Sequence, residues 1–212
     1  MPIPTTNATQ ELPAINEILA SVGQAPVTTL DQTNPDVAIA YDTLLQVSRE
    51  VQAEGWTFNK DFDVKVTPDS DDYIKIPNNV LQAKLNQHNH RGTSVVIRRD
   101  PSDNEKKLYD RTADPSTYKF TDATYRLDYV YYFDWIDLPT PIQDFIVARA
   151  AVIVSSRIVG DSTQYQMLQQ KEAYNRALAM EYECNQGDHS FFGQPQGTNY
   201  HISYQPYKAL VR

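Results

Sequence analysis

Apolar residues recur at two different spacings along the chain, and the spacing changes twice. In residues 11–22 they lie mostly three or four positions apart, which is the spacing of one helix face. A second helix is indicated after Asn34 and Pro35, because asparagine is a favoured N-cap and proline is tolerated in the first turn. Its apolar face continues to Val51, and Gly55 follows as a helix stop. The first 55 residues are therefore predicted to form two helices.

Beyond the second helix the apolar period becomes two, which is typical of a half-buried strand. Phe62, Val64 and Val66 alternate with polar residues, and Ile74 and Ile76 alternate around a lysine. Further strand candidates are residues 94–99, 107–110, 118–120 and 124–135. Turn-rich pieces separate these candidates. Residues 56–137 are therefore predicted to form an antiparallel β subdomain inserted between helices.

Helical spacing returns after the β region. Thr140 and Pro141 suit a helix start, and the apolar run 142–159 is rich enough to be buried on more than one side. A mostly polar helix is predicted over residues 163–183. The fold class predicted is α+β: a helical bundle of about four helices with an inserted antiparallel β subdomain and an extended C-terminal tail. Its predicted parts are residues 1–55 (N-terminal helices), 56–137 (β subdomain), 138–187 (C-terminal helices) and 188–212 (tail).

The tail differs in composition from the rest of the chain. Its charged side chains, Asp188, Lys208 and Arg212, sum to +1, whereas the whole chain carries −8. Its glycines and prolines disfavour a helix or a core, which leaves a disordered tail or a segment that lies on another protein. The aromatic residues favour the second reading. The residues expected to contact another protein are Phe191, Phe192, Tyr200, Ile202, Tyr204 and Tyr207.

Charge and cysteine content narrow the function classes. A net charge of −8 and an isoelectric point near 4.9 disfavour general nucleic-acid binding by phosphate neutralisation. The lone Cys184 excludes an intramolecular disulfide framework. No apolar stretch is long enough for a transmembrane helix, and the first residues lack the pattern of a signal peptide. Synthesis in the cytoplasm, without membrane association, is expected.

Catalytic and metal-binding motifs are absent from the sequence. It contains no phosphate-binding glycine loop, no zinc-protease helix motif and no nucleophile elbow. His88 and His90 form an H-x-H pair, but a third metal ligand is not apparent, so a polar loop is favoured. The acidic residues at 69, 71 and 72 read as a solvated turn, since the glycine and distal glutamate of a calcium loop are missing. Neither a cofactor nor a metal is expected.

Five short segments resemble a known family in their order and separation. They are NEILASVGQAPVTTL (16–30), EGWTFN (54–59), LYDRT (108–112), DLPTPIQDFIVARAA (137–151) and AMEYE (179–183). Together, over about residues 11–187, they are similar to the tail tubular protein A family of short-tailed phages. The segment after residue 187 matches poorly.

The resemblance implies a structural role in the virion tail. It implies a ring of twelve copies beneath the portal protein, holding the nozzle protein, tail tubular protein B, below it. Tail fibre protein attaches near that junction, and DNA passes through the lumen without sequence-specific binding. The implied fold is similar to helical-bundle connectors with an added β region. The aromatic tail residues are then expected at a portal or neighbour-subunit interface.

Three residues inside the matching segments are expected to act as fold anchors. Trp56 and Phe58 are large apolar side chains where helix gives way to the β region. Arg149 lies in an apolar helix and needs a carboxylate or carbonyl partner if it is buried.

Two other function classes stay open. A tail-associated cell-wall or polysaccharide hydrolase would need two carboxylates in one cleft, and 27 acidic residues offer many pairs. A cytoplasmic binding module with a peptide-like tail is the third hypothesis. Particle mass and symmetry discriminate the ring from both alternatives.

Overall fold

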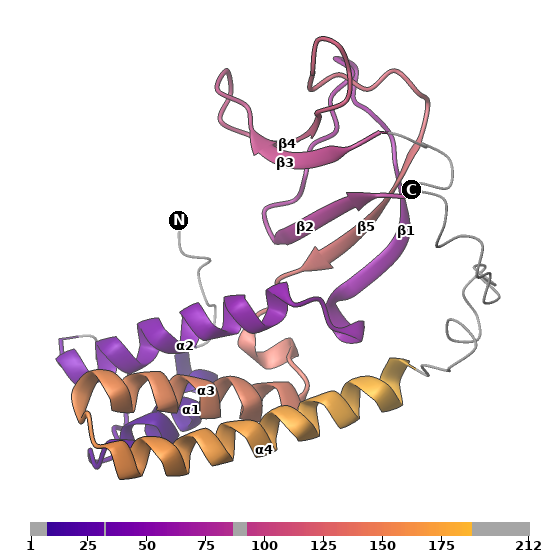
Figure 1. Ribbon diagram of the computed structural model, residues 1–212. Helices are drawn as coiled ribbons and strands as arrows, with labels where there is room; N and C mark the ends of the chain where they lie inside the picture. Colours follow the sequence, from indigo (N-terminus) through magenta and orange to yellow (C-terminus); the bar gives the residue numbers. More distant parts are fainter. Residues whose placement is uncertain (1–7, 32, 87–92, 188–212) are drawn as a thin grey trace. The chain divides into compact units, whose positions relative to one another are not determined.

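The computed structural model describes residues 8–31, 33–86 and 93–187. The helices are α1 (Ala8–Ser21), α2 (Pro35–Ala53), α3 (Thr140–Ile158) and α4 (Ser162–Gly187), and the strands are β1 (Lys60–Val66), β2 (Val80–Leu85), β3 (Val95–Arg99), β4 (Lys106–Asp110) and β5 (Tyr125–Tyr131). Short 3-10 turns cover Thr57–Asn59 and Trp135–Asp137. The predicted α+β class, with all described strands between α2 and α3, is confirmed (Figure 1). The predicted extended tail lies outside the described residues.

The chain forms two compact units, and it crosses between them inside α2. The β unit comprises residues 45–138, and the described part of the helical unit comprises residues 8–44 and 139–187. The predicted four-part division places its first boundary at residue 55 instead, and that division stays a prediction.

The helical unit is built around α3, which packs against both α1 and α4. Its buried residues lie all around the helix, as the apolar run predicted, and they include Ile142, Phe145, Ile146 and Val154. The helix begins at Thr140, one residue before the predicted first turn, and Pro139 takes the N-cap position. Polar contacts join the elements: Lys171 Nζ lies 2.6 Å from Glu17 Oε1, Arg157 donates to the Thr43 hydroxyl, and Asn175 donates to the Asp144 carbonyl.

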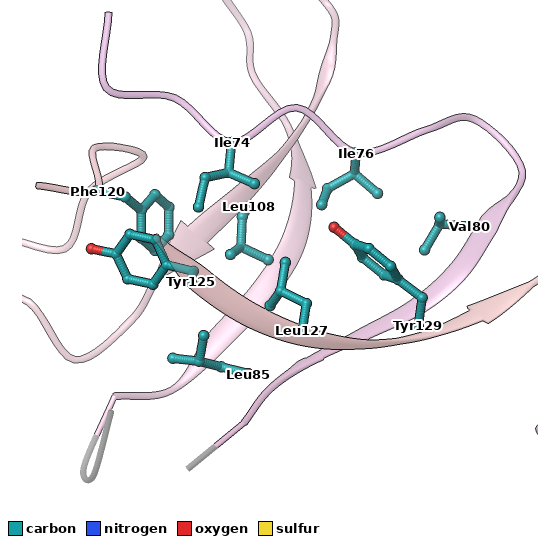
Figure 2. Close-up of a cluster of buried hydrophobic side chains, with 9 residues drawn as sticks. All are labelled: Ile74, Ile76, Val80, Leu85, Leu108, Phe120, Tyr125, Leu127 and Tyr129. Carbon is teal, nitrogen blue, oxygen red and sulfur yellow. The ribbon is translucent and has the colours of Figure 1, made fainter. Parts of the chain in front are cut away.

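The β unit contains two antiparallel sheets. One has the strand order β1-β5-β2, and the other is the β3–β4 hairpin. Figure 2 shows the side chains that converge between them from strands and from the irregular segment around residues 73–77. The core cluster comprises Ile74, Ile76, Val80, Leu85, Leu108, Phe120, Tyr125, Leu127 and Tyr129. Because these residues are all buried, the sheets are held together mainly by apolar burial.

The strand predictions were partly right. Residues 94–99 and 124–135 contain β3 and β5, and residues 107–110 cover all of β4 except its first residue, Lys106. The segments around Ile74 and residues 118–120 form only isolated bridges, Tyr73 with Lys119 and Lys75 with Lys107. Strand β2 was missed. A register shift between Val80 and Gln82 breaks its alternation, so the period-two signal is lost.

A similar irregularity explains why Phe62 is half exposed, whereas Val64 and Val66 are partly buried against the core cluster. The register of β1 against β5 shifts between Asp61 and Val64, and Asp63 adopts a φ of 59°, in the left-handed region. Such a bulge changes the face to which the following side chains point. Phe62 is instead covered in part by Lys60, whose Nζ lies 4.9 Å from the ring centroid.

Candidate functional site

The predicted contact residues of the tail lie outside the described part of the chain. They are Phe191, Phe192, Tyr200, Ile202, Tyr204 and Tyr207, all within residues 188–212. His88 and His90 also fall in an undescribed segment, 87–92. The candidate site residues that the structure does describe lie on the surfaces and in the polar clusters of the two units.

The expected fold anchors occupy different environments. Trp56 is buried, and its indole Nε1 donates to the Val51 carbonyl at 2.7 Å, which ties the 3-10 turn to the end of α2. Phe58 is half-buried, and its ring centroid lies 6.2 Å from that of Phe133. Arg149 is partly exposed on α3, so it is not the deeply buried cation that would demand a carboxylate. Their role as anchors remains a prediction.

Two buried amides, which the sequence reasoning missed, connect helix and sheet inside the β unit. Asn59 donates from Nδ2 to the carbonyls of Gln52 and Tyr131, at 2.8 Å each, and accepts from the Trp56 backbone N–H at 2.8 Å. Gln52 exchanges two hydrogen bonds with the Phe133 backbone, as donor at 3.1 Å and acceptor at 2.8 Å. The last turn of α2 is thereby held against the segment that follows β5.

A charged cluster lies in the β3–β4 hairpin. Lys107 is buried, and its Nζ donates to Asp100 Oδ2 at 2.8 Å and to the Asp103 carboxylate. It also lies 4.0 Å from the ring centroid of Tyr73. The Lys107 ammonium and the bonds from Ser102 lower the pKa of Asp100 to about 2. The two carboxylates raise the pKa of Lys107. All three groups are therefore charged at neutral pH, and the cluster is structural in character.

The arrangement in the helical unit that comes nearest to a catalytic site is a pocket of about 270 Å³ between the start of α3 and the end of α4. Asp144 and Glu181 both line it, together with Leu178 and Tyr182. Burial, and then the charge of Glu17, raise the pKa of Asp144.

Most of α4 is exposed, and its buried residues are Ala179 and Gly187. Met167 and Tyr174 expose about two thirds of their surface, at 68% and 65%, and Leu178 exposes 39%. Spacings of seven and four residues place these three on one stripe of the helix. Exposed large apolar side chains gathered on one element favour contact with another protein.

The remaining candidates from the sequence are the acidic segment at residues 69–72, the lone cysteine and possible metal ligands. Asp69 accepts hydrogen bonds from the backbone N–H groups of Asp71 and Tyr73, so this acidic segment is a turn. Cys184 is exposed. Within residues 8–31, 33–86 and 93–187, three or more potential metal ligands do not gather. Among the described helices, none has the length and apolarity to cross a membrane.

The exposed apolar stripe of α4 favours a protein that acts through contacts with other proteins. The family model for tail tubular protein matches residues 12–189, and the chain belongs to this family. Tail tubular protein A of Klebsiella phage KP34 is 27% identical over 178 residues, which cover 84% of this chain and 89% of that protein. The expected family is confirmed, and the chain is a structural component of the phage virion tail.

Proposed function

We propose that the chain is the adaptor that joins the portal protein to the tail nozzle. The observation that carries the proposal is the family match over residues 12–189. Twelve copies form a ring beneath the portal vertex, and the nozzle protein, tail tubular protein B, attaches below. Tail fibre protein binds near the junction. DNA passes through the lumen without sequence-specific contacts, which agrees with the net charge of −8.

Each predicted part has a role in this proposal. Residues 1–55 and 138–187 supply the bundle, and residues 56–137 supply the β subdomain. Trp56, Phe58 and Arg149 maintain the fold. Residues 188–212 bind the portal or a neighbouring copy through Phe191, Phe192, Tyr200, Ile202, Tyr204 and Tyr207.

The exposed stripe of α4 supports a role in an assembly. Met167 and Tyr174 offer large apolar surfaces that burial against another protein would stabilise. A ring requires such surfaces, because each copy contacts its neighbours through two different faces.

The function is tested by mixing the purified chain with purified portal protein and imaging the particles by negative stain. A ring of twelve copies attached to the portal is expected, and mass measurement gives the copy number independently. Particles of portal alone, with the chain remaining free at high concentration, contradict the adaptor role.

The tail has its own test, because residues 188–212 span up to about 80 Å when extended and so can reach another subunit. A chain that ends at Gly187 is expected to fold but to bind portal far more weakly. A second variant keeps the full length but replaces the six contact residues by serine, and it is also expected to bind portal more weakly. Unchanged portal binding by both variants refutes the tail's role, and so does unfolding of the truncated chain.

We also propose that the chain is not an enzyme. Asp144 and Glu181 line one pocket, but the sequence contains no phosphate-binding, zinc-protease or nucleophile-elbow motif, and the family match is to a tail protein. Purified chain is expected to leave peptidoglycan and capsular polysaccharide intact. Hydrolysis that is abolished by Asp144→Asn or Glu181→Gln, with Asp36→Asn as the control, establishes the hydrolase alternative instead.

A further inference from the structure

The β3–β4 hairpin carries two consecutive pairs of facing cations. The register places Arg98 opposite Lys107 and Arg99 opposite Lys106. Like charges directly opposite each other on antiparallel strands repel, so each pair needs compensation from an anion or an aromatic ring. Because successive residues of a strand point to opposite faces, the two pairs lie on opposite faces of the hairpin.

The Arg98–Lys107 pair is compensated within the chain. Lys107 is bound by Asp100 and Asp103, and the Arg98 guanidinium carbon lies 4.1 Å from the ring centroid of Tyr109. Both cations on this face therefore have an intramolecular partner that suits a positive charge.

The charges of the Arg99–Lys106 pair are not cancelled by an anion or an aromatic ring among the contacts of the described residues. Arg99 donates to the Asn104 carbonyl at 2.8 Å, and Lys106 donates to the Asn78 carbonyl at 3.0 Å. These acceptors are neutral, so they orient the two cations but do not cancel their charge. Each cation also keeps further donors, since an ammonium has three N–H groups and a guanidinium five.

These two cations share one groove of about 470 Å³ with a third, Lys75. The carboxylate that lines the groove, Glu105, is paired with Lys75 at 2.7 Å. Three cations against one carboxylate give the lining a charge of +2, in a chain whose net charge is −8. Ile76 and Pro77 add an apolar part to the same groove.

We propose that this groove binds an acidic segment of a partner protein in the tail. Arg99 and Lys106 are oriented by their carbonyl contacts, so less side-chain entropy is lost when carboxylates bind. Arginine binds carboxylates through two parallel hydrogen bonds. The proposal rests on the proposed function, because it assumes that the chain works as part of a protein assembly.

The surroundings favour acidic side chains over a nucleic-acid backbone. Asp103 and Glu105 lie in the turn that joins the same two strands and keep their carboxylates partly exposed, so a continuous row of phosphates passing the groove would meet negative charge there. An acidic peptide segment places carboxylates only where its side chains point. Its apolar side chains can also rest on Ile76 and Pro77.

The experiment uses the full chain and a labelled synthetic peptide that alternates glutamate and leucine. Fluorescence anisotropy at low salt measures its affinity. The double variant Arg99→Gln/Lys106→Gln is expected to weaken binding about tenfold, because two surface ion pairs are lost. Arg98→Gln, on the opposite face, is expected to change affinity by less than about twofold. A peptide with glutamine in place of glutamate is expected not to bind, and added salt is expected to weaken binding.

Side-chain NMR signals of the unmodified chain map the binding site without any substitution, so misfolding of a variant cannot explain the result. The acidic peptide is expected to shift the signals of Lys75, Arg99 and Lys106 and to leave Arg98 in place. The inference is overturned if the peptide does not bind, if Arg98→Gln weakens binding as much as the double variant, or if a DNA duplex binds more tightly through Arg99 and Lys106. Ring formation on the portal is measured separately, so a failure of the groove and a failure of the adaptor role are told apart.

Discussion

Lys107 donates a hydrogen bond of 2.8 Å to Asp100 from inside the β unit, where 2% of the Lys107 side chain and 10% of the Asp100 side chain are exposed. In the same unit, where Lys75 and Lys107 form an isolated β-bridge, Lys75 and Glu105 form an ion pair of similar length, 2.7 Å, with side chains 57% and 48% exposed. The β unit therefore contains one buried and one exposed ion pair of similar length.

We expect Lys107→Met to lower the thermal midpoint clearly, because it removes the cation shared by Asp100 and Asp103 and leaves the buried Asp100 carboxylate without it. Lys75→Met is the control and is expected to change the midpoint little, since exposed pairs contribute little to stability. Thermal unfolding followed by circular dichroism measures both. Equal midpoints for the two variants would show that burial does not strengthen the pair.

The Asp100 carboxyl also predicts how stability depends on pH. Its pKa falls from 3.8 to about 2 in the folded chain, because Lys107 and Ser102 bind the charged form. The folded state therefore binds fewer protons than the unfolded state between these values. The contribution is fully present above about pH 4 and is lost as the pH falls through about 2. Unfolding from pH 6 to pH 2 is expected to show the difference between wild type and Asp100→Asn shrinking with acid. A constant difference contradicts this assignment.

The Tyr129 hydroxyl is buried and finds no hydrogen-bond partner among the residues that the structure describes. Figure 2 shows Tyr129 with its ring directed into the apolar cluster, and burial raises its pKa to about 12. Tyr129→Phe is therefore expected to be neutral or stabilising by up to about 1 kcal/mol. The control is Tyr125→Phe, which removes the acceptor of the Asp122 N–H and is expected to destabilise by about 1 kcal/mol. Denaturant unfolding compares the two, and a clear loss in Tyr129→Phe would mean that the hydroxyl has a partner such as a bound water.

The helices could be predicted from the sequence because their signals are local. Asn34 and Pro35 mark the start of α2, and the Asn34 side chain does accept the Asp36 N–H at 3.0 Å. The end of α4 was harder, since it continues to Gly187 through polar residues without a stop signal. Strand β2 was not predicted, because a bulge removes the alternation of apolar and polar residues on which strand prediction depends.

The polar contacts could not be predicted in the same way. Gln52 reads as one more polar position on a surface helix, yet it is buried and bonds the backbone of Phe133, 81 residues along the chain. Lys107 likewise reads as an outward strand residue, although it is buried. Such roles depend on which segments meet in space, and apolar periodicity carries no information on that. Trp56 was identified because its size alone marks it as a residue to be buried.

Asn59 gives the sharpest test of how the end of α2 is joined to the sheet within the β unit. Its amide satisfies three backbone groups at once, the Trp56 N–H and the carbonyls of Gln52 and Tyr131. Asn59→Ala leaves all three without this partner in a buried place and is expected to cost about 2–4 kcal/mol of unfolding free energy. Asn59→Asp keeps the acceptor for Trp56 but replaces the two donors by a charge that faces two carbonyls, so it is expected to be at least as destabilising at neutral pH. At low pH the protonated acid can donate one bond, and the loss relative to wild type is then expected to shrink.

The control for both Asn59 variants is Asn78→Ala, because Asn78 is exposed and binds Lys106 through its backbone carbonyl, which the substitution keeps. Denaturant unfolding at neutral and acidic pH measures these differences. If Asn59→Ala unfolds at the same denaturant concentration as Asn78→Ala, the amide does not hold the junction.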